Sequence, residues 1–340
     1  MGIHKFESTE AFIAFDLDGA GVSSGPVRWA RKVLQGGASD LARSQTYTFA
    51  SLGMQRGGAS AGISAEWPDR EAALEAFRTE VASMVEAGTF LPDAAKGVED
   101  DDLAGLHQWD QRDTARFGAF AARCDGLSAA VTADRTVGLD GRTVAIEGLS
   151  PVGCWLAEQV VERGARVVAV STATGTAVNP EGFDVAALRA AFAAEGAECV
   201  NQFGDPFAAN AVFEQGAAVV FAGSGMGVVD HDVADKLAGS AALVASGRLH
   251  LTARGLAVLR RAGVAAPADF VSLAGSTIAA WGDPSRSDDE VLADVADTVT
   301  AINEESSHET DGPLLGACYR AESFLSTWQE RLPFGRPLAP

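Results

Sequence analysis

The sequence has few of the residues that build metal centres, disulfide frameworks or membrane spans. Its 340 residues include four cysteines, of which none stands two positions from another, and no nearby histidine pair completes a zinc pattern. We therefore expect no metal site, and buried free thiols in a reducing compartment. No apolar run reaches the length of about 18 residues that a membrane span needs, and the stretch MGIHKFESTE lacks the apolar core of a signal peptide. These absences predict a cytoplasmic protein.

Positive charge is also scarce. The chain carries 46 acidic and 26 basic residues, a formal net charge of −20, and only four lysines. Because nucleic acids and anionic membranes are polyanions, we expect neither as a partner, and a small-molecule ligand is favoured. A hydrophobic content of 47% with 12 prolines is typical of an ordered globular protein, and 340 residues are enough for two domains.

Residues 1–138 are predicted to form a first domain of mixed strands and helices. The expected elements are a strand at 11–18, a glycine-rich loop with a short strand at 19–29, and helices at 38–54, 70–88 and 102–124. The stretch MQRGGAS, at 54–60, is interpreted as a glycine turn between a helix and an apolar segment.

Residues 139–285 are predicted to form a second domain of a different kind. The stretch 141–175 has the pattern strand, glycine turn, helix, strand, and both strands are near-continuous apolar runs. Further strands are expected at 217–225, 241–247 and 268–276, and a helix at 184–196. This alternation predicts a Rossmann-type, doubly wound parallel sheet with helices on both faces. Residues 286–340 are expected to add two C-terminal helices, at 288–305 and 314–332, that pack back on the first domain.

The turn GLSPVG, at 148–153, follows a predicted strand and opens a predicted helix, as a dinucleotide fingerprint requires. Gly148 suits the tight turn and Gly153 the close packing of helix on strand, but Ser150 stands where a glycine usually lets the backbone approach the pyrophosphate. Thr172 stands where an acidic residue usually binds the adenine ribose. The expected cofactor is therefore NAD or NADP on an incomplete fingerprint, with Gly148, Ser150, Pro151, Val152, Gly153 and Thr172 as contacts.

The order of motifs resembles the glutamate/leucine/phenylalanine/valine dehydrogenases. NPEGFDV is similar to that family's NPDGLDV, GVSSGPVR to GPAxGGxR, and TYTFASLGMQRGGASAGI to TYKxAxxxLxxGGGKAxI. VVFAGSGMGVV is similar to DxxAPCALGxVI, which adds Ala222 and Gly223 to the expected cofactor contacts. The resemblance implies a two-domain fold, NAD(P)-dependent oxidative deamination of an amino acid, and homo-oligomers that pair through the first domain.

The catalytic positions implied by the resemblance carry other residues. The lysine that grips the substrate carboxylate aligns with Thr48, and the catalytic lysine with Ser60. The proton-shuttling aspartate aligns with Ala95, and two asparagines with Leu249 and Leu273. A buried carboxylate without its cation is costly, and proton transfer needs tuned acids and bases. We therefore expect altered chemistry on a small amine, imine or carbonyl compound that lacks the usual gripped α-carboxylate.

Two alternatives remain open at this point. The chain could be a catalytically inactive relative that serves as a regulatory or assembly subunit, since several polar positions are replaced together. It could also be a non-redox enzyme, a lyase or a condensing enzyme, in the same cleft.

Four residues are candidates for the catalytic site. Ser60 and Thr48 could donate hydrogen bonds to a neutral carbonyl or amine. Lys96 is a candidate base or Schiff-base nucleophile, with a surface lysine beside VEDDD as the alternative. His250 follows a predicted strand and could line the cleft.

Other reactive side chains have mainly structural interpretations. Asp93 could replace the missing aspartate only in a slipped alignment. Cys154 follows Gly153 at a helix N-terminus, where a thiolate would be stabilised, with burial as the alternative. HQWDQRDTAR, at 107–116, gathers acids and arginines on a predicted helix, where such pairs are more often structural. His231 has no evident partner.

Overall fold

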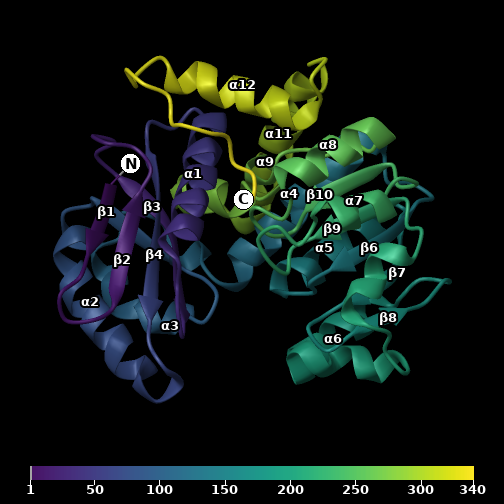
Figure 1. Cartoon of the computed structure of the whole chain (residues 1–340), viewed down its shortest axis with the longest axis horizontal. Coiled ribbons are helices and arrows are strands. Elements are labelled where there is room, and N and C mark those ends of the chain that lie inside the picture. The colour runs from purple at the N-terminus through teal and green to yellow at the C-terminus, as the bar shows by residue number, and fades with distance from the viewer. Residues whose placement is uncertain (1) are drawn as a thin grey trace. The chain divides into compact units, whose positions relative to one another are not determined.

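The computed structural model describes residues 2–340 as two compact units (Figure 1). The first unit runs to Gly118 and includes Arg320–Pro337, and the second comprises Ala119–Tyr319 with Leu338–Pro340. The division falls at 118, earlier than the limit at 138 that we predicted, because helix α4 (Ala119–Val137) packs against α5 (Pro151–Glu162) and α11 (Asp288–Ser307) of the second unit.

The first unit is built on a mixed five-stranded sheet of order β1-β2-β4-β3-β5. Its strands are β1 (Gly2–Lys5), β2 (Ala11–Phe15), β3 (Ser23–Ala30), β4 (Gly57–Ser64) and β5 (Phe90–Ala94). The strand β4 runs antiparallel to β2 and parallel to β3, and β5 runs parallel to β3. The expected strand at 11–18 is confirmed in part, whereas Gly57 and Gly58 begin a strand and do not form a turn.

Two long helices pack on this sheet. The helix α1 (Gln35–Ser51) lies along β4, and α2 (Arg70–Glu86) buries Leu74, Phe77 and Val81, as the helical spacing predicted (Figure 1). Gly58 permits the close approach of α1, because a Cβ atom there would lie 1.9 Å from the carbonyl oxygen of Ala42.

The predicted helix at 102–124 is wrong. The structure has a short helix, α3 (Asp100–Leu103), two 3₁₀ turns at 104–109 and 114–116, and then α4. The side chains of Asp110 and Asp113 accept hydrogen bonds from the backbone amides of Arg112 and Ala115, and such local bonds compete with a continuous helix.

The second unit contains the predicted Rossmann-type sheet, in the order β10-β9-β6-β7-β8. Its strands are β6 (Thr143–Glu147), β7 (Arg166–Ser171), β8 (Thr176–Val178), β9 (Val219–Ala222) and β10 (Ala242–Ala245). Four strands are parallel, and β8 is an antiparallel edge strand. The helices α5, α6 (Val185–Glu195), α7 (His231–Lys236) and α8 (Ala253–Ala262) follow the strands.

The strand expected at 268–276 is also wrong. This stretch forms α9 (Asp269–Ser272) and the start of α10 (Gly275–Trp281), because a short run that is buried on all sides has no periodicity to distinguish strand from helix. The two predicted C-terminal helices are present as α11 and α12 (Pro313–Leu325). All four cysteines are buried and free, as expected. Within residues 2–340, no helix is long and apolar enough to span a membrane.

Candidate functional site

The glycine turn between β6 and α5 is rigidly built. Gly148 has a φ angle of 77°, and a Cβ atom there would lie 2.5 Å from the backbone nitrogen of Ser224. The amide of Gly148 donates to the hydroxyl of Ser171 (3.3 Å), and the amide of Leu149 donates to the carbonyl oxygen of Ser171 (2.7 Å). Only glycine fits at 148, and the end of β7 holds the turn in place.

Some backbone amides in the first turn of α5 donate no hydrogen bond within the described residues. Ser150 caps this helix, since its hydroxyl oxygen accepts from the amide of Gly153 (3.2 Å), and Pro151 has no amide hydrogen to satisfy. In the part of the chain that the structure describes, the amides of Ser150 and Val152 have no hydrogen-bond acceptor. These two amides and the Ser150 hydroxyl proton are therefore unused donors at the start of α5.

Glu147 is a buried acid that sequence reasoning missed. Its Oε2 atom accepts from the amides of Gly223 (3.0 Å) and Ser224 (3.1 Å), and so it joins the end of β6 to the loop after β9. The predicted contacts Ala222 and Gly223 lie in this loop, but Ala222 is fully buried and the amide of Gly223 is already bound. The signal available in the sequence was an acid directly before the first glycine of the turn.

Thr172 is buried at the end of β7, and its hydroxyl donates to the carbonyl oxygen of Ala197 (2.6 Å). The neighbouring Thr174 hydroxyl donates to Oε1 of Glu198 (3.0 Å), on the 3₁₀ segment at 196–203. The exposed Glu198 therefore places a carboxylate beside the end of β7, where the sequence motif itself has none.

Ser60 and Thr48 lie in the first unit and use their hydroxyls internally. Ser60, on β4, is fully buried and donates to the carbonyl oxygen of Pro26 (3.1 Å). Thr48, on α1, is fully buried and donates to the carbonyl oxygen of Ser44 (3.2 Å). Neither side chain carries a charge, so these positions cannot grip a carboxylate as a lysine would.

Lys96 is exposed just beyond β5, which favours the surface interpretation. Asp93 pairs in register with Pro26, so it shares a sheet face with Ser60, but its carboxylate forms an ion pair with Arg112. Arg112 also binds Asp110, and although burial alone would lower the pKa of Arg112, Asp93 and Asp110 together raise it. Asp93 is thus held as part of a structural cluster.

His250 belongs to the second unit and is buried, with 2% of its surface exposed. Neither imidazole nitrogen has a hydrogen-bond partner among the described residues, and burial lowers the pKa of His250 to about 4. The imidazole is therefore neutral at neutral pH. The preceding Leu249 has a φ angle of 55° and is the only non-glycine residue among residues 2–340 with a positive φ. Asparagine tolerates this conformation better than leucine does.

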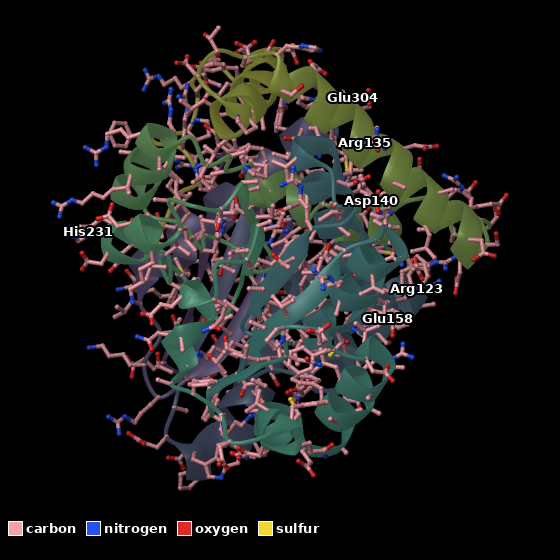
Figure 2. The ribbon with its side chains drawn as sticks, turned by 90° about the vertical axis from the view of Figure 1, so that its right-hand side faces the viewer. Arg123, Arg135, Asp140, Glu158, His231 and Glu304 are labelled. Carbon is pink, nitrogen blue, oxygen red and sulfur yellow. The ribbon has the colours of Figure 1, made fainter. Side chains whose placement is uncertain are left out.

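Burial and contacts indicate the roles of Cys154 and His231. Burial raises the pKa of Cys154 to about 12, so this residue is an inert thiol and not a stabilised thiolate. His231 lies exposed on α7 (Figure 2), and its ring and the carboxylates of Asp230 and Asp232 lie within 4.8 Å of one another. The Asp230 carboxylate already accepts from the amides of Asp232 and Val233 as a helix cap, which leaves it poorly placed for a cation.

Two surface hollows lie in the second unit, and the predicted site residues lie outside both. One has a volume of about 600 Å³ and lies between α7 and α8, and the other, of about 310 Å³, lies between α8 and the start of α12. Ser60, Thr48, Lys96 and His250 line neither hollow.

Comparison with known sequences agrees with the motif order. The profile of the Glutamate/Leucine/Phenylalanine/Valine dehydrogenase family matches residues 126–282. The glutamate dehydrogenase of Aeropyrum pernix is 44% identical over 59 residues, 17% of this chain and 14% of that protein. Glutamate dehydrogenase A2 of Halobacterium salinarum is 30% identical over 138 residues, 41% of this chain and 33% of that protein. The matched stretches thus span a third or less of these relatives.

Solved structures share the fold over most of the chain. The hetero-hexameric glutamate dehydrogenase of Thermus thermophilus, in its Leu-bound form, aligns with a TM-score of 0.78 and 22% identity, over 96% of this chain and 86% of that one. The L-tryptophan dehydrogenase of Nostoc punctiforme aligns with a TM-score of 0.66 and 19% identity, over 96% and 97%. The two-domain amino acid dehydrogenase fold that the sequence predicted is confirmed.

Proposed function

We propose that this chain, which belongs to the glutamate/leucine/phenylalanine/valine dehydrogenase family, is an NAD(P)-dependent oxidoreductase with altered chemistry. Its substrate is a small amine, imine or carbonyl compound without the α-carboxylate that a lysine would grip. The observation that carries the proposal is that Ser60 and Thr48 are uncharged and donate to their own backbone, while the Gly148 turn keeps its shape.

The turn fits a dinucleotide. Position 148 has no room for a Cβ atom, and the amides of Ser150 and Val152 and the Ser150 hydroxyl can donate to a pyrophosphate at the start of α5. Glu147 orients the loop at 223–224, because its carboxylate accepts hydrogen bonds from both amides of this loop. A bound nicotinamide supplies hydride transfer, and the residues of this chain supply binding and orientation.

Glu198 supports a preference for NAD. A carboxylate beside the end of β7 accepts hydrogen bonds from free ribose hydroxyls, and it repels the 2′-phosphate of NADP. In the usual fingerprint, an acidic residue at the position of Thr172 binds the adenine ribose. We propose that Glu198, which lies later in the chain, has this role here.

Proton transfer must differ from lysine-activated attack of water. The hydroxyls of Ser60 and Thr48 can turn toward a neutral carbonyl or amine, and the neutral His250 is too weak a base to hold a proton at neutral pH. Lys96 contributes its exposed ammonium only if a substrate extends to the surface at β5.

A second candidate function is that of a non-catalytic subunit. A structural neighbour, the Thermus thermophilus enzyme, is a hetero-hexamer, so a chain of this fold can assemble with a different chain. We expect this chain also to form oligomers, either with itself or with a catalytic relative.

A turnover screen separates these functions. The pure protein is mixed with NAD⁺ or NADP⁺ and a panel of simple amines and L-amino acids, or with reduced cofactor and ketones plus ammonia, while the absorbance of reduced nicotinamide is followed. We expect turnover of simple amines or ketones and little of L-amino acids. Turnover without nicotinamide would instead indicate a lyase or condensing enzyme, and no turnover under any condition would favour the non-catalytic subunit.

A further inference from the structure

Arg28, a half-buried residue on β3, differs from the buried arginines of the first unit. Its Nε and Nη2 atoms are withdrawn from solvent and have no partner among the protein atoms of residues 2–340. By contrast, Arg43 donates from Nε to Asp16 (2.6 Å) and from Nη1 to the carbonyl oxygen of Gly335 (2.8 Å). Two guanidinium nitrogens that are withdrawn from solvent and have no partner call for an explanation.

The position of Arg28 relates it to Ser60. In the sheet register, Arg28 is paired with Gly62 on β4, and Ser60 lies one row away on the same face, opposite Pro26. Gly62 has no side chain because Val33 and Phe12 already fill the space there: a Cβ atom at Gly62 would lie 2.6 Å from Cγ1 of Val33 and 2.7 Å from Cζ of Phe12. Arg28 thus lies next to the position where the family resemblance places the catalytic lysine.

The unpaired atoms have a specific chemistry. Nε and Nη2 form one edge of the guanidinium, a planar fork of two parallel donors that matches the two oxygens of a carboxylate. Arg112 in the same unit shows this geometry, since its Nε donates to Oδ1 of Asp110 (3.0 Å) and its Nη2 to Oδ2 (2.7 Å). Burial lowers the pKa of Arg28, yet an arginine remains charged at neutral pH.

We infer that the Nε–Nη2 edge of Arg28 binds the carboxylate of a small-molecule ligand on the sheet face that carries Ser60. The inference deepens the proposed function and rests on it only for the identity of the substrate. It gives that substrate an acidic group held by an arginine, in place of an α-carboxylate held by a lysine at the position of Thr48. Both nitrogens are sealed from solvent in this conformation. The carboxylate therefore binds after the Arg28 side chain rotates about its aliphatic bonds and exposes the Nε–Nη2 edge.

The binding can be measured on the whole protein without a cofactor. Propionate and the uncharged acetamide are titrated separately while the arginine Nε–H signals are followed by NMR, with the Arg28 signal assigned from Arg28→Lys. We expect a saturable shift of the Arg28 signal with propionate and none with acetamide. By calorimetry, Arg28→Lys, which keeps the charge but loses the fork, should weaken propionate binding about tenfold or more. Arg31→Lys, at an exposed arginine just beyond β3, should leave it unchanged.

Three results would overturn the inference: no saturable response of Arg28 to propionate, an equal response to acetamide, or equal propionate affinity in Arg28→Lys. The first would mean that no carboxylate reaches the Nε–Nη2 edge of Arg28. Thermal melting of each variant checks that it is folded, and Arg28→Gln serves as a second variant if Arg28→Lys is not. Nicotinamide binding is measured separately, so propionate binding without nicotinamide binding would refute the proposed function alone, and the reverse would refute the arginine site alone.

Discussion

Arg112, in the loop at 110–116, and Arg28, on β3, lie in the same unit, and they show two uses of an arginine whose nitrogens are withdrawn from solvent. Arg112 binds Asp110, Asp93 and the carbonyl oxygen of Pro92. Its charge is therefore paired within the protein, and these contacts hold the loop at 110–116 against β5. Arg28 lies beside Ser60 with one edge unpaired. The difference teaches that a cation fully paired within the protein supports the fold, whereas a cation with an unpaired edge is available to a ligand.

The largest expected effect comes from removing the paired arginine. Arg112→Leu leaves the carboxylate of Asp110, whose side chain is 2% exposed, without its cation, and should lower the free energy of unfolding by about 3–5 kcal/mol. Arg28→Leu is the matched variant, and because no carboxylate loses a partner, its cost should be within about 1 kcal/mol. Urea denaturation of both variants measures the difference. Equal losses would remove the distinction between the two arginines.

His250 extends the comparison to a buried group that is neutral. Its pKa falls from 6.5 to about 4, so between these values the unfolded chain binds a proton that the folded chain does not. The free energy of unfolding therefore decreases as the pH falls from about 6.5, by about 3 kcal/mol at pH 4. His250→Phe should remove this part of the pH dependence, as measured by urea denaturation at pH 7 and pH 5. A variant with the same pH dependence as the original protein would show that His250 does not titrate in this way.

A smaller effect is expected at the glycine turn, where shape alone is tested. Gly148→Ala introduces a Cβ atom into the backbone of Ser224 and should cost about 2–3 kcal/mol, together with loss of dinucleotide binding. Gly141→Ala is the control, since Gly141 has a φ angle of 72° but open space around it, and should cost about 1 kcal/mol. Thermal unfolding and calorimetry check both effects, and undisturbed NAD⁺ binding in Gly148→Ala would place the cofactor elsewhere.

The smallest expected effect concerns the choice of cofactor. Glu198→Gln removes the carboxylate beside the end of β7 and should shift the ratio of NADP⁺ to NAD⁺ affinity by about tenfold toward NADP⁺. Glu195→Gln, an exposed acid three residues earlier, is the control. An unchanged ratio in Glu198→Gln would assign the selectivity to other residues.

The fold was predictable where a local pattern determines the structure. The apolar strands around GLSPVG and the spacing of Leu74, Phe77 and Val81 on α2 depend on neighbouring residues only, and both predictions hold. The helix predicted at 102–124 failed because two aspartates bind nearby amides, and the strand predicted at 268–276 failed because a fully buried run has no period.

The site was less predictable, because its features depend on contacts across the sheet. No sequence pattern shows that Arg28 lacks a partner, that Glu147 binds the amides at 223–224, or that Glu198 reaches Thr174. The replacement of charged positions by Thr48 and Ser60 was visible in the sequence, but the use of both hydroxyls within the backbone was not.

Calorimetric titration of the pure protein with NAD⁺, NADP⁺ and their reduced forms tests the central claim most directly. We predict saturable binding of at least one nicotinamide dinucleotide, tighter for NAD⁺ than for NADP⁺, and its loss in Gly148→Ala. The absence of binding by all four at millimolar concentration would contradict the claim that this chain is an NAD(P)-dependent oxidoreductase.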